Sequence, residues 1–182
     1  NAVEAANKAT GWTNATAHNR AQVLYYIGEN LSARAEEFAQ RIQQLQGKSK
    51  KDALAEVELC ISRIFTYAAM ADKYEGQIHT PPQRLVTLAM KEAIGNIAIV
   101  APEEAGLLGL ISTLMPAIAM GNRVILVPSK QTALFATDLY QVFDTSDVPA
   151  GVINIITGER GPLTDTLAKH YDIEGFWYWG DA

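Results

Sequence analysis

The residues GNRVILVPSKQTAL, 121–134, show the architecture of this chain more clearly than any other stretch. They read as a turn, a short apolar strand, a second turn and the beginning of a helix. Strand-to-helix turns of this kind hold nucleotides in α/β proteins, because ligands gather at the carboxyl ends of parallel strands. This turn offers a ligand the side chains of Val127, Ser129 and Lys130, and it lacks a glycine fingerprint. The stretch therefore predicts a strand–helix unit and leaves open whether it holds a cofactor.

The alternation of strand and helix continues through the second half of the chain. Short apolar runs, IAIVA, VILV, VINIIT and EGFWYW, alternate with helical segments near 106–119, 131–144 and 162–169. Such alternation is typical of right-handed βαβ units and a parallel sheet. The predicted fold class is α/β, with N-terminal helices and a partial doubly wound, Rossmann-like sheet.

The first third of the chain is predicted to be helical. One helix is expected in HNRAQVLYYIGENL, and Ser32 is expected to cap a second helix that Gly47 ends. The third helix is the clearest, since its apolar residues recur at steps of three and four until Gly76 ends it. That apolar stripe consists of Leu54, Val57, Ile61, Ile64, Ala68 and Ala71.

The proline pair Pro81-Pro82 then breaks the helical pattern. The segment RLVTLAMKEAIG that follows is predicted to be extended, with Val86, Leu88 and Met90 on one side. An extended strand with an unpaired edge invites pairing with another chain.

The chain has 182 residues, enough for a single domain with a core. We divide it into a helical part (1–76), an extended segment (77–95) and a Rossmann-like βαβ part (96–182).

Composition and charge narrow the possible functions. The formal net charge of -5 argues against nonspecific nucleic-acid binding, which needs clustered positive charge. No apolar run approaches the roughly 20 residues that a membrane-spanning helix needs. The N-terminus lacks a secretory signal pattern, so we expect a cytoplasmic protein without membrane or nucleic-acid partners.

The cysteine and the histidines give no catalytic or metal-binding pattern. Cys60 lies inside the clearest amphipathic helix, without a neighbour that would stabilise a thiolate, so we expect it to pack in the core. His18, His79 and His170 are far apart and show no metal-ligand spacing. The sequence therefore predicts no metal site.

Two further clusters have a functional and a structural interpretation. Glu103 and Glu104 follow the strand IAIVA, where paired carboxylates could bind a metal or act as acid and base. The preferred interpretation is an acidic pair that stabilises the beginning of the next helix. The aromatic run Phe176–Trp179 is expected to fill both faces of a central strand, with a ligand-binding shelf as the alternative.

The stretch VAPEEAGLLGLISTLMPAIAMGNRVILVPSKQTAL resembles the first βαβ unit of the NAD(P)-dependent aldehyde dehydrogenases. That family reads approximately I-x-P-W-N-x-P, a helix, then P-A-L-A-x-G-N-x-V-V-x-K-P-S-E. The residues in register are Pro102, Pro116, Ala117, Ile118, Ala119, Gly121, Asn122, Val124, Pro128 and Ser129. The segment DVPAGVINIITGERGPLTDTLAKH is similar to the family's P-x-G-V-x-N-x-V-x-G segment and the helix after it. The resemblance extends over nearly the whole chain.

Two departures bear on the cofactor that the resemblance implies. Val127 stands where the family has the lysine of K-P-S-E, and Lys130 stands where it has the glutamate. In the family these two side chains hold the hydroxyls of the adenine ribose, which valine and an ammonium group cannot do in the same way. Losing two such hydrogen bonds weakens binding by about two to four powers of ten. We expect NAD(P) to bind weakly, through vestigial contacts at Ser129, Gly158 and Gly180.

Two more departures concern charge. Glu104 aligns with the asparagine that donates to the developing oxyanion in the family, and a carboxylate there would repel that charge. Trp179-Gly180-Asp181 aligns with the family's threonine-glycine-serine turn, where an aspartate would oppose a pyrophosphate. The family's nucleophilic cysteine and general-base glutamate lie beyond Ala182, so no catalytic residue is assigned in this chain.

The pattern is similar to the shortened, degenerate second module of tandem (family-16-type) aldehyde dehydrogenases. This implies a non-catalytic structural, oligomerisation or docking module whose partner is its own full-length aldehyde dehydrogenase module or a second copy. The alternative is a truncated NAD(P)-binding half of an enzyme that oxidises aldehydes to carboxylates. A third possibility, an unrelated ligand-binding protein, depends on Glu103, Glu104 and the aromatic strand alone.

Overall fold

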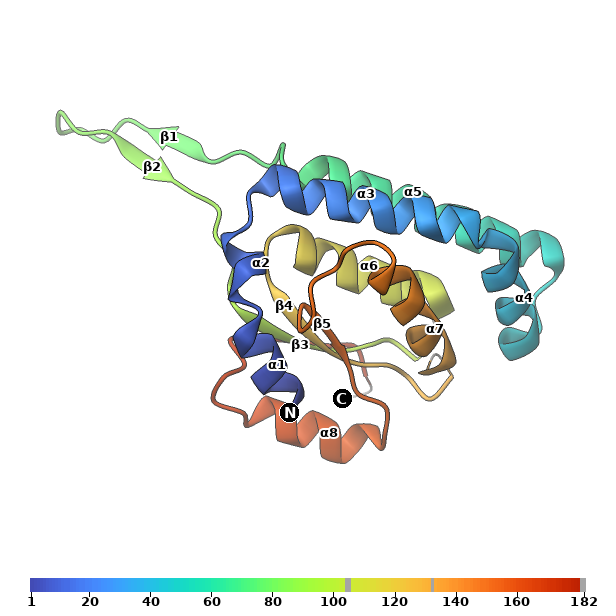
Figure 1. Ribbon diagram of the computed structural model, residues 1–182. Coiled ribbons are helices and arrows are strands. Elements are labelled where there is room, and N and C mark those ends of the chain that lie inside the picture. The colour runs from blue at the N-terminus through green and yellow to red at the C-terminus, as the bar shows by residue number, and fades with distance from the viewer. Residues whose placement is uncertain (104–105, 132, 181–182) are drawn as a thin grey trace.

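The computed structural model describes residues 1–103, 106–131 and 133–180. A parallel four-stranded sheet in the order β5-β4-β3-β6 forms its centre (Figure 1). The strands are β3 (Asn96–Val100), β4 (Arg123–Val127), β5 (Ile153–Ile155) and β6 (Gly175–Tyr178). The order confirms the predicted doubly wound α/β fold, because the chain first builds outward from β3 to β5 and then crosses to β6 on the other side.

Eight helices are found in the described part of the chain. They are α1 (Ala2–Lys8), α2 (Thr10–Asn14), α3 (Ala17–Ala33), α4 (Ala35–Gln46), α5 (Lys50–Ala71), α6 (Gly106–Ala119), α7 (Ala133–Asp144) and α8 (Arg160–Ala168). Helices α6 and α7 cover one face of the sheet, with α3 and α5 as a further layer, whereas α1 and α8 cover the other face (Figure 1). None of the described helices is both long and apolar enough to span a membrane.

The alternation of side chains along each strand divides the core into two. On β3, Ile97 and Ile99 pack towards α6, whereas Ala98 and Val100 pack towards α1 and α8. All five residues of β3 are buried, as expected for a central strand covered on both faces. Helix α6 lies between the sheet and α5, which explains why it is apolar around most of its circumference.

The N-terminal helices correct part of the prediction. Ser32 does not cap a helix, because it lies inside α3; α4 begins after Arg34, which makes no side-chain capping bond. Gly47 does end α4, in the left-handed conformation with φ of 67°. Helix α5 ends at Ala71, earlier than the predicted Gly76. The sequence pattern also does not reveal the short helices α1 and α2, which span fewer than eight residues each.

The predicted extended segment forms an antiparallel hairpin of β1 (Gln77–His79) and β2 (Thr87–Ala89). The hairpin projects from the body of the molecule (Figure 1), and every residue of its two strands is exposed. Ile78 lies opposite Leu88, so these two side chains share one face of the hairpin.

The aromatic strand is not central, contrary to the prediction. β6 lies at the edge of the sheet and pairs with β3. Consequently Phe176, Tyr178 and Trp179 remain 36%, 47% and 43% exposed, respectively. The aromatic run misled the prediction, because a high strand propensity does not distinguish a strand at the edge of a sheet from a central one.

Candidate functional site

The candidate site is the edge of the sheet where its parallel strands end. The loops after β3, β4, β5 and β6 all emerge there, since all four strands run in the same direction. The order of the strands reverses between β3 and β6, and ligands of open α/β sheets bind outside the strand ends at such a switch point.

The turn after β4 points most of its groups inward. Val127 is fully buried in an apolar cluster with Ala98, Val100 and Ile125, on the face covered by α1 and α8. Ser129 is also fully buried, and its hydroxyl donates to the main-chain oxygen of Glu103 at 3.4 Å. Lys130, in contrast, is exposed, and its ammonium is the only charged group among these three side chains.

The two glycines predicted to make vestigial cofactor contacts lie in different loops of this edge. Gly158 is exposed and stands two residues before α8, where an added Cβ would approach the Cδ1 atom of Leu163 to 3.2 Å. Gly180 follows β6, and an added Cβ there would collide with the phenol ring of Tyr178. A side chain at position 158 would therefore be a tight fit, and one at position 180 would require the Tyr178 ring to move.

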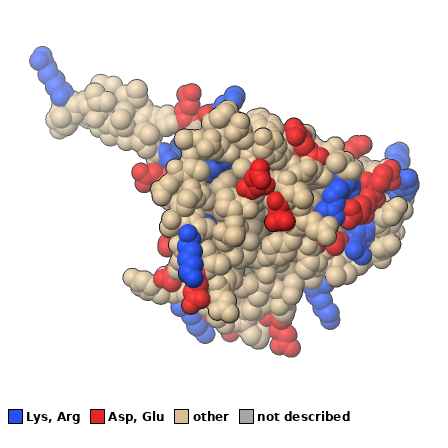
Figure 2. All heavy atoms as spheres, viewed as in Figure 1, with Lys and Arg blue, Asp and Glu red and all other residues tan. Residues whose placement is uncertain are grey.

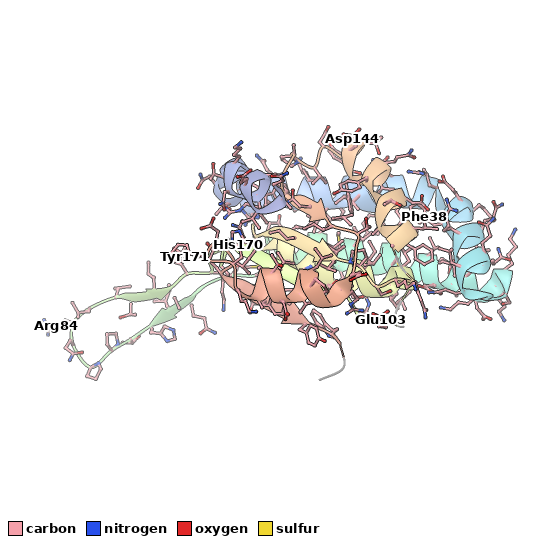
Figure 3. All side chains as sticks on the ribbon, turned by 90° about the horizontal axis from the view of Figure 1, so that it is seen from below. Phe38, Arg84, Glu103, Asp144, His170 and Tyr171 are labelled. Carbon is pink, nitrogen blue, oxygen red and sulfur yellow. The ribbon has the colours of Figure 1, made fainter. Side chains whose placement is uncertain are left out.

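The sequence pattern does not single out Arg160, which the structure places at the switch point. Its Nη2 atom donates to the main-chain oxygen of Ala101, after β3, at 2.8 Å and to that of Trp179, after β6, at 3.3 Å. Its Nη1 atom pairs with the carboxylate of Glu103. Figure 3 shows Glu103 beside one end of α8 and His170 beside the other. The available signal was an arginine at the beginning of a helix that follows a strand end.

The acidic pair is only half described. Glu103 forms an ion pair with Arg160 across the strand ends. Glu104 and Asp181 lie outside the described residues, so their predicted opposition to negative charge stays a prediction.

The remaining titratable candidates lie away from this edge. Cys60 is fully buried in α5, and burial raises the pKa of its thiol, with a further contribution from the neighbouring Glu56 carboxylate. The Nδ1 atom of His18 lies 3.5 Å from the Oδ2 atom of Asp72. His79 is on the exposed hairpin, and His170 follows α8. Within the described residues, no three His, Cys, Asp or Glu side chains group as metal ligands.

A shallow hollow of about 410 Å³ adjoins β6 on the side of α6. Its lining consists of Ser112, Thr113, Pro116, Trp177, Tyr178 and Trp179. It has no charged lining residue, and Trp177 and Trp179 meet edge to face with ring centroids 6.1 Å apart. This is the aromatic shelf of the alternative interpretation, and it offers a ligand apolar contact but little specific hydrogen bonding.

Two side chains at the end of β4 differ from the ribose-binding pair that the resemblance to the aldehyde dehydrogenases implies. The side chain of Val127 offers neither a donor nor an acceptor, and the ammonium of Lys130 is a donor only. The guanidinium of Arg160 is already bonded to two carbonyl oxygens and a carboxylate.

Comparisons with known proteins place this geometry in a family. The sequence profile of the aldehyde dehydrogenase family matches residues 1–181. The chain is 30% identical to 2,5-dioxopentanoate dehydrogenase of Saccharolobus solfataricus, over 98% of this chain and 38% of that protein. It is also 30% identical to hydroxyisobutyraldehyde dehydrogenase of Mycolicibacterium austroafricanum, over 98% of this chain and 35% of that protein. The chain thus spans well under half of these relatives.

Solved structures agree. An NAD-dependent aldehyde dehydrogenase from Sinorhizobium meliloti superposes with a TM-score of 0.91 at 26% identity, covering 96% of this chain and 36% of that one. PnpE in complex with nicotinamide adenine dinucleotide superposes with a TM-score of 0.91 at 25% identity, with the same coverage. The family profile covers almost every residue, and both solved structures superpose on 96% of the chain. The chain therefore belongs to the aldehyde dehydrogenase family.

Proposed function

We propose that this chain is a non-catalytic module of a larger aldehyde dehydrogenase, of the kind found as a degenerate second module in tandem members of the family. Its role is assembly. The hairpin of β1 and β2 docks on the full-length aldehyde dehydrogenase module of its own polypeptide or on a second copy of this chain.

The observation that carries this proposal is the exposure of apolar side chains on and beside the hairpin. Figure 2 shows the projecting hairpin as mostly uncharged, with a basic side chain at its tip, where Figure 3 places Arg84. The exposed apolar side chains are Ile78 (77%), Leu85 (65%), Val86 (76%), Leu88 (58%), Met90 (71%) and Ile94 (59%). Apolar groups gathered on one projecting element mark a surface for a partner, because each loses contact with water when covered.

The chemistry of the described residues supports a role without catalysis. The single cysteine of the chain is Cys60, whose buried thiol cannot form the exposed thiolate that a nucleophile needs. At the strand ends, Val127 belongs to the core and supplies no hydrogen bond to a ribose. We therefore expect NAD(P) to bind weakly, through main-chain groups near Gly158 and Gly180.

The alternative is the NAD(P)-binding half of an active enzyme, which is favoured by the relatives named above and by the dinucleotide in PnpE. Titration with NAD⁺ and NADP⁺, followed by tryptophan fluorescence, separates the two functions. A dissociation constant below about 100 μM would support the alternative, whereas the assembly module predicts a value weaker than about 1 mM.

The assembly role is tested by charging one face of the hairpin. Ile78→Asp with Leu88→Asp places two carboxylates on the apolar face, whereas His79→Asp with Thr87→Asp places them on the opposite face as a matched control. Sedimentation velocity should show self-association of the unchanged chain, or its binding to the parent module. That association should disappear in the first variant and persist in the control. An unchanged chain that stays monomeric and ignores the parent module would refute the proposal.

A further inference from the structure

Open α/β sheets bind ligands in a crevice at the switch point, and in this chain a side chain of the protein itself crosses that point. β3 and β6 are neighbours in the sheet but far apart in sequence, and Ala101 and Trp179 are the residues that directly follow them. Arg160 reaches both residues, since one of its nitrogen atoms donates to the main-chain oxygens of Ala101 and Trp179. A single guanidinium thus joins the ends of β3 and β6. An open α/β sheet receives its ligand between two such strands.

The charge of this guanidinium is already balanced. Its other terminal nitrogen pairs with Glu103, whose side chain is 46% exposed, whereas that of Arg160 is only 17% exposed. A phosphate bound to this guanidinium would therefore lie close to the Glu103 carboxylate, which repels it. Charged hydrogen bonds of this kind are stronger than neutral ones, and a ligand would have to replace three of them.

We propose that Arg160 is a specificity-determining residue that closes this crevice to dinucleotides. The closure is independent of the ribose contacts at Val127 and Lys130, because it acts at the switch point between β3 and β6 and not at the end of β4. It extends the proposed function, since a module with a closed crevice acts through its surface alone.

The closure also has a mechanical consequence. Among the described residues β6 pairs with β3 alone, so its end depends on few bonds. The amide of Trp179 donates to the main-chain oxygen of Val100 at 3.1 Å, and the bond from Arg160 to the Trp179 oxygen reinforces the same position. Removing the guanidinium should release the end of the strand as well as open the crevice.

The test compares Arg160→Ala with Arg20→Ala. Arg20 is a matched control, because its guanidinium also donates to two main-chain oxygens, those of Ala15 and Ala119, but at the opposite end of the sheet. Arg160→Ser provides a second opening variant if the alanine variant does not fold, since serine is readily accommodated in the first turn of a helix. Each variant is titrated with NAD⁺, and amide exchange of residues 175–180 is measured without ligand.

We expect the dissociation constant for NAD⁺ to fall about tenfold or more in the Arg160 variants, with faster amide exchange of β6, and neither change in Arg20→Ala. Affinity no better than that of Arg20→Ala would overturn the closure. Weaker binding would also overturn it, because Arg160 would then be a ligand of the dinucleotide. Hairpin-dependent association does not involve Arg160, so sedimentation of the same variants shows separately whether the assembly role holds.

Discussion

Val127, the last residue of β4, and Lys130, in the turn after it, differ in what a substitution would do to the stability of the fold. Both depart from the family's pattern, yet Val127 is fully buried among apolar neighbours whereas Lys130 is exposed. The valine is therefore part of the core on the face of α1 and α8, and its replacement affects folding as well as binding. The lysine can change without disturbing any packed group.

We expect Val127→Lys to lower the free energy of unfolding by about 1–3 kcal/mol, because it introduces a charge into an apolar cluster. Lys130→Glu should change it by less than about 0.5 kcal/mol, as is usual for an exposed position. Urea unfolding followed by circular dichroism measures both. Equal effects of the two substitutions would show that Val127 does not contribute to the core as described.

The helices show that capping depends on the neighbouring turn and not on the residue type alone. Ser49 caps α5, since its hydroxyl accepts a hydrogen bond from the amide of Asp52 at 3.1 Å. Ser32 looks equivalent in sequence but lies inside α3, where its side chain is exposed. Helix α5 is further tied to α6 by Glu56, which accepts from the amide of Leu108 at 3.2 Å and pairs with Lys48 at 2.5 Å.

Ser49→Ala should therefore destabilise the protein by about 1 kcal/mol, because the first turn of α5 loses its cap. Ser32→Ala is the control and should leave stability unchanged or slightly raised, since alanine has the higher helix propensity. The midpoints of urea unfolding compare the two. A loss at Ser32 as large as that at Ser49 would mean that the capping assignment is wrong.

The whole molecule consists of a body with two separate cores and a hairpin that contributes to neither. The body is closed on both faces of its sheet, whereas the hairpin leaves its apolar side chains in solvent (Figure 1). A partner that covers the hairpin would bind only the folded chain, so association would stabilise the fold by mass action.

The melting temperature should therefore rise with protein concentration over a range of about a hundredfold. The variant with aspartate at positions 78 and 88 should melt at a temperature that does not depend on concentration. Differential scanning calorimetry at several concentrations measures this difference. A melting temperature of the unchanged chain that is independent of concentration would argue against self-association and leave the parent module as the only partner.

The sequence by itself determined the type and approximate extent of most elements. Steps of three and four in α5 and the alternation of apolar strands with helices predicted the α/β fold, and the resemblance predicted the family. These signals are local, since each depends on residues within a few turns or one strand. The residues of the turn after β4 were located correctly for the same reason.

Only the tertiary structure decided which strands are neighbours and what their ends contain. It placed the aromatic strand at an edge, where Trp179 remains 43% exposed. It also placed Arg160, the first residue of α8, in contact with Glu103 and Ala101 after β3. These contacts join residues about twenty to sixty positions apart. Strand order and side-chain packing determine such contacts, and a local pattern of residues specifies neither of them.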